Sequence, residues 1–130
     1  MSMSLAKYVL VFAGVLAAAF DSTSAQASSW VGVMKSDNGK RARVTAFVNA
    51  ETVQLRFGEP VNCTIDANFL DVENGTSVYR FHVSQNGGAF CDRLYPGELM
   101  VTPSSTDSLR MSFRRHLVPW WGVLERGTDR

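Results

Sequence analysis

The feature that most constrains this chain is an alternation of apolar and polar residues that recurs after residue 28 and is interrupted by short turn signals. Between residues 41 and 49, apolar side chains occupy the even positions and polar or charged ones most of the odd positions. Asn38-Gly39 and Asn74-Gly75 are dipeptides that tolerate positive φ and suit tight hairpin turns. No window of about a dozen residues keeps the helical period. The pattern predicts antiparallel β-structure.

The alternation divides the chain into short segments separated by Gly, Pro and Asn. We expect strands at 30–35, 41–49, 52–57, 62–69, 77–84, 98–102 and 109–114, with 89–94 carrying a cysteine and 116–124 forming an apolar closing segment. A turn is expected at 86–88. The side chains expected to face inward in the central strands are Cys63, Ile65, Ala67, Phe69, Tyr79, Phe81 and Val83. About eight strands fit this meander.

The two ends of the meander carry related pentapeptides. Trp30-Val31-Gly32-Val33-Met34 and Trp120-Trp121-Gly122-Val123-Leu124 both read Trp-x-Gly-Val-aliphatic. A small all-β domain can remove its exposed edges by pairing its first and last strands. We therefore predict an all-β fold, a small antiparallel meander that closes into a roughly eight-stranded barrel. A sandwich is the alternative.

The first residues resemble a signal peptide. Lys7 precedes an uncharged apolar run at 8–20, which is shorter than the roughly twenty residues that a membrane span needs. Ala25 and Ala27 provide the small side chains that a signal peptidase accepts. We predict cleavage after Ala27, which makes 1–27 a signal peptide and 28–130 a single all-β domain that is periplasmic or secreted. An uncleaved N-terminal anchor is the alternative.

The chain has two cysteines, and both follow the predicted cleavage point. Export would deliver Cys63 and Cys91 to an oxidising compartment, where a thiol pair that is close in space persists as a disulfide. Such a bond would stabilise a small domain by restricting its unfolded chain. Two free thiols, or half of a metal site, are the alternatives.

Charge and motifs argue against several function classes. The formal net charge is +1 with both signs interspersed, so nothing indicates nucleic acid, or a membrane after signal cleavage. The candidate general bases are His82 and His116, and neither lies in a recognisable catalytic motif. Metal-binding spacings and cofactor motifs are also missing from the sequence. We expect no enzyme activity, no metal and no cofactor.

Arginine and aromatic residues are the candidates for a binding surface. Arg41 and Arg43 share the polar face of one expected strand, and another carries Arg110 and Arg114 with Arg115 beside them. If those strands are neighbours, the guanidiniums form one patch suited to carboxylates, phosphates or an acidic protein. An ordinary solvated exterior is the alternative.

The aromatic candidates are Phe47, on the nominally polar side of its strand, and the adjacent pair Trp120 and Trp121. Adjacent residues of a strand point to opposite faces, so one tryptophan should lie outside. Exposed Trp and Arg are enriched at protein-interaction hot spots. The exposed aromatic residue could equally cap a barrel end.

These features favour an exported, non-enzymatic binding module for a protein partner. In size, export signal and single disulfide the chain resembles small periplasmic lysozyme inhibitors and immunity proteins against cell-wall-degrading toxins, a likeness of architecture that assigns no residue roles. One alternative is a lipocalin-like carrier with a small ligand in the barrel mouth. An enzyme of unrecognised type that uses His82 or His116 is the other. An internal pocket would favour the carrier, and a filled core with exposed Trp and Arg would favour the protein binder.

Overall fold

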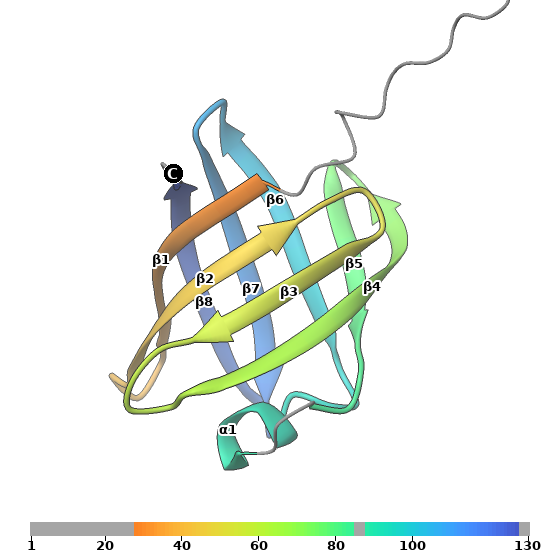
Figure 1. The fold of residues 1–130 in the computed structure, drawn as a ribbon. Coiled ribbons are helices and arrows are strands. Elements are labelled where there is room, and N and C mark those ends of the chain that lie inside the picture. Colours follow the sequence, from red (N-terminus) through yellow and green to blue (C-terminus); the bar gives the residue numbers. More distant parts are fainter. Residues whose placement is uncertain (1–27, 85–87, 128–130) are drawn as a thin grey trace, which may run out of the picture.

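The computed structural model describes residues 28–84 and 88–127, which form a closed antiparallel barrel of eight strands (Figure 1). The predicted signal peptide at 1–27 and residues 86 and 87 of the predicted turn lie outside the described residues. The strands are β1 (Ser28–Ser36), β2 (Arg41–Val48), β3 (Thr52–Phe57), β4 (Cys63–Glu73), β5 (Thr76–Phe81), β6 (Glu98–Ser105), β7 (Ser108–Arg115) and β8 (Val118–Arg126). Each strand pairs with the next one along the chain.

The barrel closes because the last strand pairs with the first. In the β1–β8 ladder, Gly32 lies opposite Leu124 and Lys35 lies opposite Trp121. The two related pentapeptides therefore occupy the two strands that meet at the closure. This pairing confirms the predicted barrel and excludes the open sandwich that the sequence left as an alternative.

Aromatic rings fill the barrel interior. Phe113 lies between Phe81, at a centroid distance of 6.1 Å, and Trp120, at 6.3 Å. Phe57 contacts Phe113 edge to face, also at 6.1 Å. Smaller inward residues, including Ala42, Ala46 and Ala67, make room for these rings and are almost completely buried. The alternation thus predicted which face of each central strand forms the core.

Two residues predicted to face the core are exposed instead. Phe69 pairs with the buried Tyr79 but is itself 42% exposed, because the residues of β4 after Ala67 lie beyond the filled part of the barrel. Val83 is 64% exposed, because β5 ends at Phe81 rather than at residue 84. The period of a strand predicts which side of the sheet a residue faces. It does not predict where along the strand the packed interior of the barrel ends.

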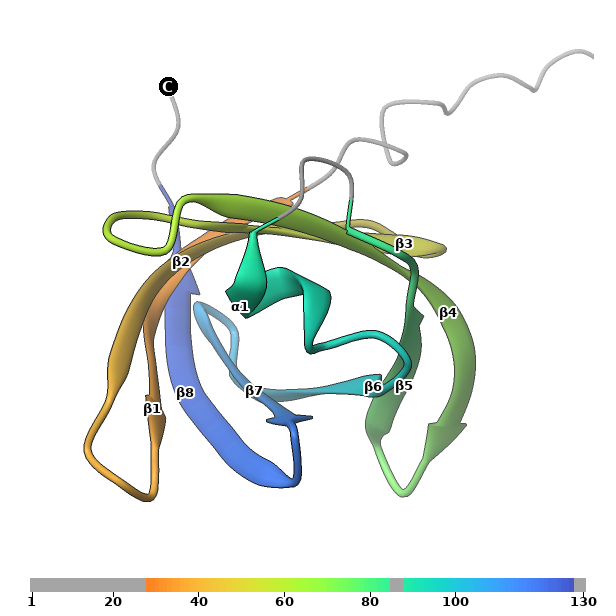
Figure 2. The same cartoon turned by 90° about the horizontal axis from the view of Figure 1, so that it is seen from below.

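One end of the barrel is closed by a short helix, α1 (Ala89–Asp92) (Figure 2). The periodicity of the sequence gives no sign of this helix, because its four residues are too few to establish a period. Cys91 within it is buried and forms the predicted disulfide with Cys63 at the start of β4. The ring of Phe90 packs against Phe57 at 4.9 Å and Trp120 at 5.1 Å, so α1 plugs this end.

Candidate functional site

The arginines on β2 and β7 do not form the single patch that their sequence positions suggested. That patch required the two strands to be neighbours, but β1 and β8 lie between them in the barrel wall. With about 4.8 Å between adjacent strands, roughly 14 Å separates β2 from β7. Arg41 and Arg43 therefore lie on one side of the β1–β8 pair, and Arg110 and Arg114 lie on the other.

The surface between these arginines is mostly apolar, and the charged Lys35 and Glu125 also lie on its outer side. The outward residues of β1 and β8 include Val31, Trp121 and Val123, which are 43%, 42% and 48% exposed. Val33 on β1 lies opposite Arg43, and Val123 on β8 lies opposite Arg110. We call this surface the seam face and define it by Val31, Val33, Trp121 and Val123 with the flanking Arg41, Arg43 and Arg110. It combines an exposed apolar strip with cations on both sides.

The adjacent tryptophans have different environments. Trp120 is 3% exposed and stacks against Phe113 inside the barrel, whereas Trp121 lies on the outer surface opposite Lys35. This is the arrangement that an extended strand requires of neighbouring residues. Only Trp121 of the pair is therefore accessible to a partner.

Phe47 is partly covered by an arginine. It lies half-buried on the outer side of β2, and the Arg56 guanidinium lies 5.1 Å from the centre of its ring. Across the ladder from Phe47 is Ser29 on β1. Phe47 is thus at the margin of the seam face, and its exposed area is reduced by this cation–π contact.

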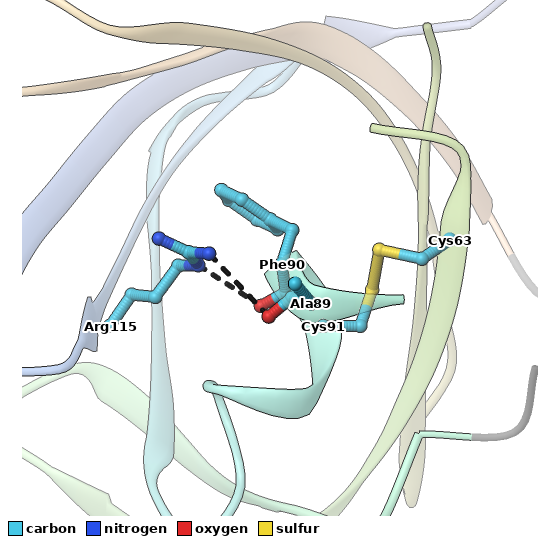
Figure 3. Close-up of a disulfide and its surroundings, with 5 residues drawn as sticks. All are labelled: Cys63, Ala89, Phe90, Cys91 and Arg115. Carbon is cyan, nitrogen blue, oxygen red and sulfur yellow. Dashed lines mark hydrogen bonds between the residues drawn. A yellow bond between two sulfur atoms is a disulfide. The ribbon is translucent and has the colours of Figure 1, made fainter. Parts of the chain in front are cut away.

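Arg115 is engaged in holding the helix plug. Its Nε donates to the carbonyl oxygen of Phe90 at 3.1 Å, its Nη2 donates to that of Ala89 at 3.4 Å, and the guanidinium lies 4.3 Å from the centre of the Phe90 ring (Figure 3). Burial lowers the pKa of Arg115, and the positive charge of Arg93 lowers it further. The disulfide holds α1 from β4, while Arg115 holds it from β7. The sequence grouped Arg115 with the surface arginines, but this side chain has a structural role.

Beside the plug, the outer wall is hollowed into a groove of about 960 Å³. It runs over the outer side of β5, β6 and β7, between the loop that follows α1 and the turn that joins β7 to β8. We define the groove by its main lining residues: Arg80, Asp92, Arg93, Tyr95, Glu98, Met100, Arg114, His116 and Leu117. Arg114 was predicted as a binding residue, and His116 as a possible base.

The turn at the rim of this groove is unusual. His116 and Leu117 have φ values of 56° and 70°, a left-handed conformation that is uncommon for residues other than Gly, Asn and Asp. Leu117 is also 83% exposed. A leucine in this conformation gains no packing there, which makes the turn a candidate for function. Sequence reasoning missed Leu117, because His-Leu carries no turn signal of the Asn-Gly kind.

The two histidines lie on the surface of the part of the chain that the structure describes. His82 and His116 are both exposed, and neither side chain forms a hydrogen bond or ion pair with a described residue. Within 28–84 and 88–127, no three His, Cys, Asp or Glu side chains gather as a metal site would require. The surfaces described above are suited to binding through apolar contact and through arginine hydrogen bonds.

Comparisons with known proteins returned no relative: no protein-family profile, no curated protein and no solved structure matches this chain. Among the described residues, none of the helices has the length and apolar character needed to cross a bilayer.

Proposed function

We propose that this protein is a non-enzymatic binding module that recognises a protein partner through the seam face. The observation that carries the proposal is the exposed strip of Trp121, Val123 and Val31 between two groups of arginines. Trp and Arg are enriched among the residues that dominate interface energetics, and exposed apolar patches mark interaction sites. The matching surface of the partner has an apolar ridge bordered by carboxylates.

The filled interior supports a protein binder over a small-ligand carrier. An eight-stranded barrel has room either for its own side chains or for one small ligand. Here the rings of Phe81, Phe113 and Trp120 occupy the interior, and Phe90 of α1 closes one end. A ligand in a lipocalin-like position would have to displace this packing.

We further propose that the protein is exported and acts in the periplasm or outside the cell as an inhibitor or immunity protein. The signal-like segment at 1–27 and the Cys63–Cys91 disulfide both support this location, because such bonds persist in oxidising compartments. A disulfide-closed, ring-filled barrel is also a rigid support for a binding face, which lowers the entropic cost of association.

Affinity capture with matched variants tests the seam face. The protein is used to capture partners from periplasmic or secreted extract, alongside Trp121→Ser, Arg110→Gln and the control Val72→Ser. Val72 is 54% exposed on β4, away from the seam face. Val72→Ser therefore also removes an exposed apolar side chain, but it leaves the seam face unchanged. We expect the unchanged protein and Val72→Ser to capture the same partner. Trp121→Ser and Arg110→Gln should not capture it. Equal capture by all variants would contradict the proposal.

A further inference from the structure

The groove beside the plug contains three arginines that form no ion pair with a described acid. The guanidiniums of Arg80, Arg93 and Arg114 form no ion pair or hydrogen bond with the described residues, although Glu98 lies directly across the ladder from Arg80. The pKa of Arg115 is lowered first by burial and then by the positive charge of Arg93, so Arg93 lies close enough to Arg115 for the two charges to interact. Planar guanidiniums in such a setting are suited to bidentate contacts with carboxylates.

The remaining lining decides which kind of anion fits. Asp92 and Glu98 lie in the same groove as the arginines. A uniformly anionic polymer, such as a nucleic acid or a sulfated glycan, would also place some of its phosphate or sulfate groups next to these two carboxylates, which would repel them. A polypeptide can instead place its carboxylates at the arginines and neutral or basic groups at the acids. The mixed charge of the groove therefore favours a peptide.

The groove also offers apolar contacts. Tyr95 is 45% exposed and Leu117 is 83% exposed, and both line the groove together with Met100. The left-handed turn at His116 and Leu117 holds the leucine side chain at the rim, where it packs against little of its own protein. An apolar side chain of a bound peptide would bury Leu117 and Tyr95, and so would offset the cost of that turn.

From these observations we infer that the groove binds an extended acidic segment of the partner protein, with carboxylates at Arg80, Arg93 and Arg114 and an apolar side chain against Leu117 and Tyr95. The groove adjoins the seam face across β7, where Ser112 lies opposite Trp121 and Arg114 lies opposite Pro119. One partner can therefore cover both surfaces. This inference rests on the proposed function, because it takes the ligand to be part of a protein.

Selection from a display library of random peptides tests the inference without knowledge of the partner. The disulfide-bonded protein and its Arg80→Gln/Arg93→Gln/Arg114→Gln variant are each used as bait. We expect peptides that alternate Asp or Glu with an apolar residue to be enriched on the unchanged protein alone. Fluorescence anisotropy with the best enriched peptide should then show at least about a tenfold loss of affinity in the triple variant. Raising the salt concentration should also weaken binding.

Two further variants make the result specific. Leu117→Gly removes the side chain and suits the left-handed turn, so it should keep the fold while it weakens peptide binding. Trp121→Ser should leave peptide binding unchanged, because Trp121 lies on the seam face and outside the groove. If Trp121→Ser no longer captures the partner but still binds the peptide, the lost capture is due to the seam face and not to the groove.

Three results would overturn the inference. The first is a selection that enriches no acidic sequence, and the second is equal enrichment on the triple variant. The third is a heparin oligosaccharide that binds in the groove more tightly than the best peptide, which would assign the site to a sulfated glycan.

Discussion

Gly32 on β1 and Gly122 on β8 occupy equivalent positions at the barrel closure, and each one faces the backbone of the other strand. A Cβ atom on Gly32 would lie 2.6 Å from the carbonyl oxygen of Val123. A Cβ on Gly122 would meet the carbonyl oxygen of Val33 and would lie 2.9 Å from Met34 Sδ. The two related pentapeptides thus contact each other, and their shared glycine allows the strands to approach closely.

Gly122→Ala should destabilise the protein by about 1–3 kcal/mol, because the added methyl group must push β1 and β8 apart. The measurement is urea unfolding at constant pH. Gly58→Ala is the control, since a Cβ there would meet nothing closer than 3.9 Å. Equal stability of Gly122→Ala and Gly58→Ala would show that the closure has more space than the structure indicates.

Arg115→Met should lower the unfolding free energy by about 1–2 kcal/mol, because the carbonyl groups of Ala89 and Phe90 lose a charged donor. Amide hydrogen exchange of α1 should increase more than exchange of the strands, since the plug then depends on the disulfide and on Phe90. Arg114→Met is the matched control, because Arg114 is exposed and has no hydrogen bond to a described residue. A change in Arg114→Met as large as that in Arg115→Met would count against the anchoring role.

Truncation of the two adjacent tryptophans should change stability by very different amounts. Trp120→Ala removes a ring that contacts Phe113 and Phe90, and should cost about 3–5 kcal/mol. Trp121→Ala removes a ring on the outer surface, and should change stability by no more than about 0.5 kcal/mol. Chemical unfolding followed by circular dichroism gives both values. A larger loss for Trp121→Ala would mean that the outer ring contributes to the fold rather than to binding.

Stability should fall as the solution becomes alkaline, in part because of Tyr79. Burial raises the pKa of Tyr79 above its ordinary value of 10.0. At a pH between the ordinary pKa and the raised pKa, the unfolded chain has lost the Tyr79 hydroxyl proton and the folded chain has kept it. Stability therefore decreases as pH rises above about 10. Unfolding of the unchanged protein and Tyr79→Phe at pH 9 and pH 11 measures this effect. Tyr79→Phe should lose less stability than the unchanged protein between these two pH values, and an equal loss in both proteins would show that Tyr79 does not cause the decrease.

Most of the barrel could be predicted from the sequence, because a strand with one buried side has a strict period of two. The inward positions at Val44, Leu55 and Ile65 follow directly from this period. The helix plug could not be predicted, because one helical turn is held by contacts from distant strands, namely the Cys63 disulfide and the Arg115 hydrogen bonds. Local periodicity contains no information about such long-range contacts.

The candidate sites were predictable only in part, because strand order decides which outward residues share a surface. The sequence singled out Trp121, Arg43 and Arg110, but it could not show that valines of β1 and β8 lie between the arginines. The groove depends on a loop, a turn and three strands that meet only in the folded barrel. Arg80 and Arg93 therefore looked like ordinary surface residues until the fold placed them together with Arg114.

Photo-crosslinking in the native host most directly tests whether the outer seam of this barrel is a protein-binding surface. A photoreactive amino acid is placed at position 121 on the seam face, or at position 72 on β4 as the control. We predict that position 121 yields one discrete crosslinked protein and that position 72 yields none. The same product from both positions, or no protein product from position 121, would contradict the account.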